Sequence, residues 1–165
     1  MSGSPEDHIA IQQVLARYCR GIDRVDMDLV RSCYWPDAQD HHGAFSGDRE
    51  AFIVWVEEVL RSRFTATQHA LHQSVIECEG DEAFVETYFR AWHTPADPAQ
   101  TGKLVLYGRY VDRMERRGGE WRIALRQLVS DLRGIDPIED LTDVDDPAGG
   151  RRGREDPSYG LRLRP

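Results

Sequence analysis

The sequence predicts an α+β fold, with one strongly curved antiparallel sheet and helices on its concave side. In the first part of the chain, apolar residues recur every three or four positions, as they do on one face of an amphipathic helix. From Leu71 onward they alternate with a period of two, which is typical of half-buried strands. Helices followed by a run of strands, with no internal repeat, are the order expected of an α+β domain.

The first helix is predicted to begin at Pro5 and to end near Asp23. Ser4 suits the N-cap, Pro5 suits the first helical position, and Asp7 can complete a capping box. Gly21 weakens the last turn. The apolar face of this helix consists of Ile11, Val14, Leu15, Tyr18 and Ile22.

Two further helices are expected before the strands. Asp26 caps a short helix, which Pro36 ends. The stretch "DAQDHHGAFSG", residues 37–47, is too polar and turn-rich for a helix, and predicts a short strand followed by a loop. Asp48 then caps a second amphipathic helix. Its apolar side consists of Phe52, Val56, Val59 and Leu60.

Four longer strands complete the predicted domain. Gly80-Asp81 makes the first turn, a loop with two prolines follows the second strand, and Gly118-Gly119 makes the last hairpin. The predicted strands are Leu71 to Glu79, Ala83 to His93, Lys103 to Glu115, and Glu120 to Asp131.

Composition narrows the class of protein. A chain of 165 residues with 40% hydrophobic and 30% charged residues predicts one soluble globular domain. The net charge of −8 argues against nucleic acid or an anionic membrane as partner. No apolar run approaches the ~20 residues of a membrane span, and the N-terminus lacks the pattern of a signal peptide. Three cysteines without a C-x-x-C spacing fit a reducing cytoplasm and buried free thiols.

The composition changes at about Gly134, so residues 1–133 are predicted to form the domain and residues 134–165 a C-terminal arm or tail. An acidic block is followed by the basic "GGRRGRE" and by "YGLRLRP". One interpretation is a mobile tail. The other is an arm laid over a neighbouring subunit or over the mouth of a pocket, because several apolar residues in this stretch could be buried.

His69 and His72, in "TATQHALHQSVIE", raise the question of a metal site. With period-two alternation the two side chains point to opposite faces of a sheet, so they cannot hold one ion together. Asp40, His41 and His42 could add ligands on paper. However, no rigid element carries a two-histidine-and-carboxylate spacing, so no metal is predicted.

His69 shares its face with Leu71 and is therefore expected to point inward. A buried imidazole needs a hydrogen-bond partner, and Asp23 at the end of the first helix is the natural one. Two interpretations stay open: a satisfied core histidine, or a dyad in which the carboxylate fixes the tautomer and leaves the other ring nitrogen as a base.

Three stretches resemble the SnoaL-like branch of the nuclear-transport-factor-2-like superfamily. They are "ARYCRGIDRVDMDLVRSCYWPDAQDHHGAFSG", "TQHALHQSVIE" and "GRYVDRMERRGGEWRIALRQLVSD", and the resemblance covers roughly Asp7 to Arg133. It implies a cone, in which a bent antiparallel sheet, mixed at its edge, wraps around N-terminal helices and leaves a deep apolar pocket. Members of this branch include scytalone dehydratase, bile-acid dehydratase, hexachlorocyclohexane dehydrochlorinase and polyketide cyclases.

The resemblance also implies roles for particular residues. The catalytic histidine–aspartate pair of the dehydratases matches His69 and Asp23, and a catalytic tyrosine of the bile-acid enzyme matches Tyr18 in "ARYCRGID". A second pocket histidine matches His93 in "AWHTP". Two tyrosines that hold water in scytalone dehydratase are replaced here, one by His41 and one by Ile22, so dehydration of the scytalone type is not implied.

These residues together predict a cofactor-free lyase or isomerase that removes a proton from carbon and expels a leaving group. His69 would be the base, Tyr18 a donor to the developing negative charge, and His93 an acid. Arg126 shares its strand face with Ala124 and could bind a carboxylate or phenolate. The aromatic residues expected to contact a ring-bearing substrate are Trp55, Tyr88, Trp92 and Tyr107.

Three functions remain open from the sequence. The first is the lyase or isomerase acting on a small cyclic or aromatic molecule. The second is a binding module with the same cone and no turnover, and the third is an accessory subunit, because fold alone does not fix function. Exposed apolar positions on the outer sheet face predict a homo-oligomer, with a trimer favoured over a dimer by the resemblance.

Overall fold

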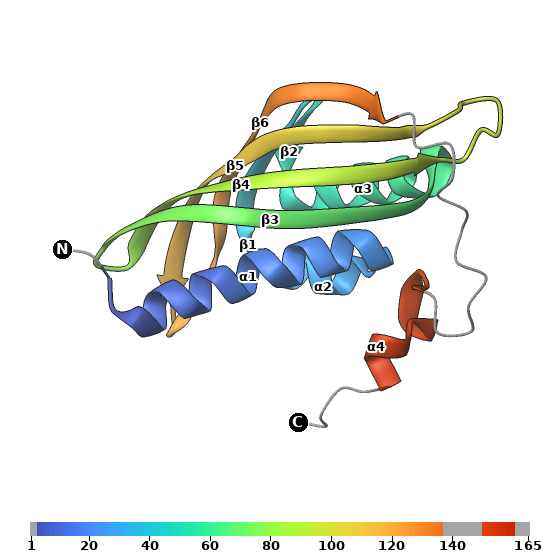
Figure 1. Ribbon diagram of the computed structural model, residues 1–165. Helices are drawn as coiled ribbons and strands as arrows, with labels where there is room; N and C mark the ends of the chain where they lie inside the picture. The colour runs from blue at the N-terminus through green and yellow to red at the C-terminus, as the bar shows by residue number, and fades with distance from the viewer. Residues whose placement is uncertain (1–2, 137–149, 161–165) are drawn as a thin grey trace.

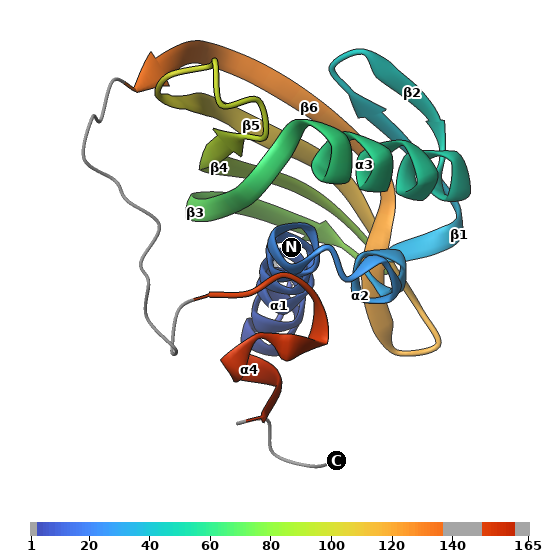
Figure 2. The same ribbon diagram turned by 90° about the vertical axis from the view of Figure 1, so that its right-hand side faces the viewer.

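The computed structural model describes residues 3–136 and 150–160, and it confirms the predicted α+β class (Figure 1). One six-stranded sheet curves around the N-terminal helices without closing on itself (Figures 1 and 2). The strand order is β2-β1-β6-β5-β4-β3, so β2 and β3 are the edge strands. All neighbours pair antiparallel except β1 and β6, which run parallel.

The helix α1, Pro5–Arg24, has the predicted capping box at its start. Ser4 Oγ accepts from the backbone N–H of Asp7 at 3.1 Å, and the Asp7 carboxylate accepts the backbone N–H of Ser4 at 3.2 Å. At the other end Val25 adopts a left-handed conformation with φ 53°, and Asp26 caps α2, Met27–Ser32. Gly21 permits this tight junction, because a Cβ there would lie 2.6 Å from Cγ2 of Val30.

Three predicted boundaries in the first half of the chain are wrong. The short helix ends at Ser32 and is not ended by Pro36, which lies within the following strand. The stretch expected to be a strand and a loop is a hairpin of β1, Tyr34–His42, and β2, Phe45–Asp48, turning at Gly43 with φ 64°. After the Asp48 cap and α3, Arg49–Arg63, the strand β3 starts at Phe64 rather than Leu71 and runs to Glu79. The early start places His69 well inside a strand that pairs with β4 along its length.

The remaining strands follow the prediction closely. β4 is Glu82–Pro95, β5 is Lys103–Arg117, and β6 is Glu120–Asp136. β6 ends five residues after its predicted end at Asp131 and three residues after the domain boundary expected at 133. α1 and α3 lie against the concave face of the sheet (Figure 2). The core between these helices and the sheet includes Ile11, Val14, Leu15, Phe52, Ile53, Val85, Phe89, Met114 and Ile123.

Residues 150–160 pack against their own domain at the C-terminal end of α1 (Figures 1 and 2). This segment holds a short 3-10 turn, Gly153–Glu155, and α4, Pro157–Gly160. Asp156 pairs with Arg24 at 2.9 Å, and the Tyr159 hydroxyl donates to Asp26 at 2.5 Å. Residues 137–149 and 161–165 of the predicted arm lie outside the described residues. None of the described helices is both long and apolar enough to cross a membrane.

A buried ion pair joins β5 and β6 inside the cone. Nε and Nη2 of Arg126 each donate to the Asp112 carboxylate at 2.7 Å, and both residues are almost inaccessible to solvent. The guanidinium carbon lies 4.2 Å from the ring centroid of Tyr18 and 4.1 Å from that of Tyr110. Both charges depend on each other, because an isolated buried ion is strongly unfavourable.

We expect Asp112→Asn to lower the free energy of unfolding by about 3–5 kcal/mol, since it leaves the Arg126 cation buried without a counter-ion. Urea unfolding followed by circular dichroism measures the loss. The control is Glu57→Gln, which removes an exposed pair with Arg61 and should cost less than about 0.5 kcal/mol. A loss for Asp112→Asn no larger than the control's would contradict the interpretation.

Candidate active site

Asp23 and His69 lie in contact where the last turn of α1 meets β3. The Nδ1–H of His69 donates to Asp23 Oδ1 at 2.7 Å, and the backbone N–H of His69 donates to Oδ2 at 3.0 Å. Thr67 Oγ1 adds a third donor to Oδ1 at 3.0 Å. Because a carboxylate only accepts, Nδ1 carries the proton and Nε2 is left as an acceptor. The side chains of His69 and Asp23 are 9% and 11% exposed, so the pair is largely shielded from water.

His93 lies beside this pair on the same concave face. It is 7% exposed, and its ring centroid lies 5.5 Å from that of His69 in an edge-to-face arrangement. On its other side Phe64 lies at 4.8 Å. Burial, with a smaller contribution from the neighbouring His69, lowers the pKa of His93 to about 4. His93 is therefore neutral at pH 7, which is unfavourable for the role of proton donor expected of it.

An aromatic wall continues from the histidines toward α3. Phe89 lies 6.5 Å from the His69 ring and stacks on Tyr110 at 4.3 Å. Trp55 of α3 packs on Phe45 at 5.2 Å, at the far end of the same interior. Of the four aromatic residues predicted to contact substrate, Trp55 is the one that faces this interior.

Tyr88, Trp92 and Tyr107 lie on the outer face of the sheet, so their prediction as pocket residues is wrong. Neighbouring residues of a strand point to opposite faces, and His93 and Phe89 take the inner face of β4. Outside, the guanidinium of Arg90 lies 4.2 Å from the Trp92 ring and 5.0 Å from the Tyr107 ring. The homo-oligomer was predicted from exposed apolar positions on this outer face, and these aromatic residues add to them. The assembly itself stays a prediction.

His42, rather than the predicted His41, points into the cone. His41 lies on the outer side of β1, where Nδ1 contacts Ser46 Oγ at 2.8 Å. The ring of His42 lies among Phe52, Trp55 and Tyr110, at centroid distances of 5.4, 6.0 and 6.4 Å. Strict alternation along "DAQDHH" would have given His42 the same face as Asp40, but a strand of this length was not expected there.

Asp40 and His42 form a second carboxylate–histidine pair. Asp40 is almost inaccessible, its Oδ2 accepts the Tyr34 hydroxyl at 2.7 Å, and its Oδ1 lies 3.3 Å from His42 Nδ1. From the sequence, Asp40 and His42 were expected at most to be metal ligands. Among residues 3–136 and 150–160, no group of three or more histidine, cysteine or acidic side chains is arranged to hold a metal ion.

Tyr18 and Arg126 point inward as predicted, but both are engaged with other groups. The carboxylate that Arg126 binds is Asp112, so the edge expected to meet a substrate is occupied. Tyr18 is 1% exposed and contacts Arg126, Tyr34 and Tyr110. Burial raises the pKa of Tyr18, so its hydroxyl stays protonated. His72, by contrast, is exposed on the outside of β3.

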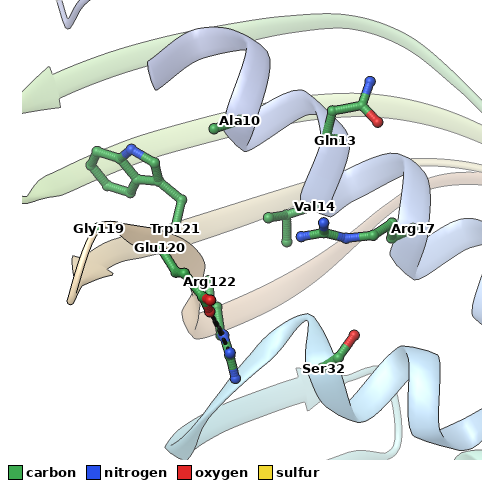
Figure 3. A pocket seen from close by; sticks show the side chains of 9 residues that line it. All are labelled: Ala10, Gln13, Val14, Arg17, Ser32, Gly119, Glu120, Trp121 and Arg122. Atoms are coloured by element: carbon green, nitrogen blue, oxygen red, sulfur yellow. Dashed lines mark hydrogen bonds and ion pairs between the residues drawn. The ribbon is translucent and has the colours of Figure 1, made fainter. Parts of the chain in front are cut away.

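A groove of about 400 Å³ opens beside Asp23 and His69 between α1 and β3. Its other lining residues are Ala16, Cys19, Arg20, Arg24, Gln68 and Leu71. A second hollow, of about 440 Å³, lies between α1, the end of α2 and the hairpin that joins β5 to β6 (Figure 3). Its lining includes Arg17, Trp121 and Arg122 but neither Asp23 nor His69, so this hollow lies apart from the Asp23–His69 pair.

The fold and the site together define a cone-shaped α+β protein with a shielded histidine–aspartate pair at the end of its first helix. The family model described as a SnoaL-like domain matches residues 4–127. The chain belongs to this family. No curated protein matches the chain.

Solved structures of the same fold include several named for elimination reactions. A "Putative Scytalone Dehydratase" from Novosphingobium aromaticivorans is 20% identical, with a TM-score of 0.71 over 82% of this chain and 95% of that chain. Hexachlorocyclohexane dehydrochlorinase LinA type 3 from Novosphingobium barchaimii is 18% identical, with a TM-score of 0.72 over 79% and 90%. A protein of unknown function from Mycobacterium tuberculosis is 25% identical, with a TM-score of 0.69 over 86% and 87%. These likenesses establish the cone fold.

The lowered pKa of His93 predicts a specific acid sensitivity. The folded protein keeps His93 neutral down to about pH 4, whereas the unfolded chain protonates it near 6.5. This contribution to stability is present above pH 6.5 and is lost as the pH falls through 4. Between pH 7 and pH 4, wild type should lose on the order of 3 kcal/mol more unfolding free energy than His93→Gln.

Urea unfolding at the two pH values, compared between wild type and His93→Gln, measures this difference. His72→Gln, which changes an exposed histidine of the neighbouring strand, should follow wild type. Equal acid sensitivity in wild type and His93→Gln, or a titration of the His93 ring near 6.5 by nuclear magnetic resonance, would rule the explanation out.

Proposed function

We propose that this protein is a cofactor-independent lyase or isomerase that acts on a small cyclic or aromatic molecule by dehydratase-like proton abstraction and elimination. The observation that carries the proposal is the 2.7 Å contact between His69 Nδ1 and Asp23 Oδ1 in a shielded site beside a groove. Two of the structural neighbours are named for dehydration and dehydrochlorination, which are both eliminations.

In this mechanism Nε2 of His69 takes a proton from a carbon next to a carbonyl or an activated ring. The electron pair of the C–H bond becomes a double bond as the bond to the leaving group breaks. The departing oxygen carries away its electron pair and receives the proton held by the imidazolium, so that water is lost and His69 returns to its starting state. Asp23 stabilises the imidazolium while it exists.

The buried surroundings suit such a step. Asp23 is already held by three donors, so it needs no rearrangement when the imidazolium forms. His93 is neutral, so we assign it the role of hydrogen-bond partner to substrate rather than of acid. Phe89 and Tyr110 stack on each other behind His69 and are both buried, so they keep this side of the imidazole apolar. Tyr18 supports this wall from behind and remains a predicted donor to developing charge.

A binding module without turnover is the alternative from another class. It would use the same groove and aromatic wall, but would not depend on the basicity of His69. An accessory subunit would instead depend on the outer face of the sheet. Turnover that depends on His69 and Asp23 separates both alternatives from the proposed enzyme.

His69→Ala should reduce kcat by roughly 10²–10⁴-fold, because the base is removed. Asp23→Asn should also reduce it strongly, since an amide neither stabilises the imidazolium nor fixes the same tautomer. The assay screens hydroxylated aromatics and cyclic ketones for loss of water, and follows uptake of solvent deuterium at the carbon next to the carbonyl.

His72→Ala is the matched control, because it removes an exposed imidazole three residues away on the same strand. It should retain wild-type activity. An active substrate that is turned over equally well by wild type, His69→Ala and Asp23→Asn would refute the proposed mechanism.

A further inference from the structure

The segment 150–160 carries an arginine, Arg152, to the end of the cone where Asp23 and His69 lie. Nη1 of Arg152 donates to the backbone carbonyl of Leu60 in the last turn of α3, at 3.0 Å. A few residues further on, Asp156 pairs with Arg24 at the end of α1. The segment thus spans from α3 to α1, and Figure 2 shows it beside the end of α1.

One edge of the Arg152 guanidinium is buried and has no hydrogen-bond partner among the described residues. Nε and Nη2 are both inaccessible to solvent, and no described residue accepts a hydrogen bond from either atom. In a planar guanidinium these two N–H groups point the same way and form one side of the donor fork. Buried donors without acceptors cost free energy, so this edge is expected to have a ligand when the protein is at work.

The chain itself shows what that edge binds. Nε and Nη2 of Arg126 hold the two carboxylate oxygens of Asp112, both at 2.7 Å. The same two atoms of Arg109 hold the carboxylate of Asp131, at 3.0 and 2.9 Å. Arg152 presents the same pair of atoms without the carboxylate. A carboxylate matches the spacing and the charge of this edge.

The unpartnered edge lies at the same end of the cone as the proposed catalytic pair. The negative charge of Asp23 acts on Arg152, although burial, reinforced by the nearby Arg61, lowers the pKa of Arg152 overall. Leu60, which accepts from Arg152, lies four residues before Phe64. Phe64 contacts His93, and His93 contacts His69, so a short series of contacts connects Arg152 to the catalytic pair. Asp23 does not bind this edge, since its oxygens accept from Thr67 and His69.

The local charge also favours an anion. The chain as a whole has a net charge of −8, which repels anions from most of its surface. The groove beside His69, however, is lined by Arg20 and Arg24 as well as by Asp23. Arg24 is paired with Asp156, so Arg20 and Arg152 are the residues that add positive charge at this end of the molecule. An anionic ligand would therefore meet positive charge where the groove opens.

We propose that the free Nε/Nη2 edge of Arg152 binds a carboxylate carried by the ring substrate, which makes the substrate class a ring carboxylic acid. That the bound acid is a substrate rests on the proposed function, but binding of the anion by Arg152 does not depend on turnover. Arg152 anchors the carboxylate, and the ring then extends along the groove toward His69.

The test uses 2-naphthoate and its neutral counterpart 2-naphthamide as probes for the whole chain. The Nε–H resonance of Arg152, assigned from its loss in Arg152→Gln, should shift on addition of naphthoate and stay in place with naphthamide. By titration, Arg152→Gln should weaken naphthoate binding roughly ten- to hundredfold and leave naphthamide binding unchanged. Arg152→Lys, which keeps the charge and loses the fork, should fall between wild type and Arg152→Gln.

Arg154→Gln is the matched control, because it removes an exposed positive charge from the same segment, and it should bind naphthoate as wild type does. His69→Asn should retain naphthoate binding, which separates this site from the catalytic proposal. Wild type that binds neither probe, or binds both equally, overturns the inference, and so does an Arg154→Gln loss as large as that of Arg152→Gln. Each of these results leaves the activity test of His69 and Asp23 standing.

Discussion

The architecture of the site depends on one carboxylate, that of Asp23, which joins the first helix to an edge strand. Its oxygens accept from the hydroxyl of Thr67 and from the backbone and ring N–H groups of His69. β3 has a strand partner on one side only, so this helix-to-strand connection takes part in holding its free side. The same three bonds orient the imidazole. Fold and proposed chemistry therefore share one set of contacts, and a change that disturbs the junction of α1 and β3 disturbs the base as well.

The order of elements could be predicted from the sequence, because it depends on local patterns. The Asp23–His69 pair joins residues 46 positions apart, and the residues alone left it as one of two interpretations, to which the family resemblance added the catalytic roles. Capping residues set the helix starts, and period-two alternation along β4 places Phe89 and His93 on the same face. The same rule excludes Trp92 from that face, so grouping the two residues in one pocket was an inconsistency that the sequence could have exposed. His42 was missed for a different reason: residues 37–47 were predicted to be a short strand followed by a loop, and the strand was not expected to reach His42, so alternation was not applied there.

The pairing of Arg126 with Asp112 could not be predicted, because it depends on an irregularity in the register of β5 and β6. Counting back from the hairpin at Gly118-Gly119, Arg117 faces Glu120 and Met114 faces Ile123. A shift of one residue follows, so Arg113 faces Leu125 and Asp112 faces Arg126. Without the shift, the register would have placed Asp112 opposite Leu125, which cannot form an ion pair. No residue type in the sequence marks the shift, and it decides whether Arg126 is a substrate ligand or a buried structural cation.

Electrostatics at the end of α1 links the proposed base to a part of the chain outside the family match. A carboxylate in the last turn of a helix faces the negative end of the helix dipole, and the donors and positive charges around Asp23 offset that unfavourable field. Arg20 supplies some of that charge from α1 itself. Arg152 adds more from residues 150–160, beyond the match that ends at residue 127. If Arg152 also holds the substrate, as we propose, one residue of this segment supports the base and selects the acid that the base acts on. Relatives that share the cone and the pair but differ in this segment would then differ in substrate while keeping the same proton transfer.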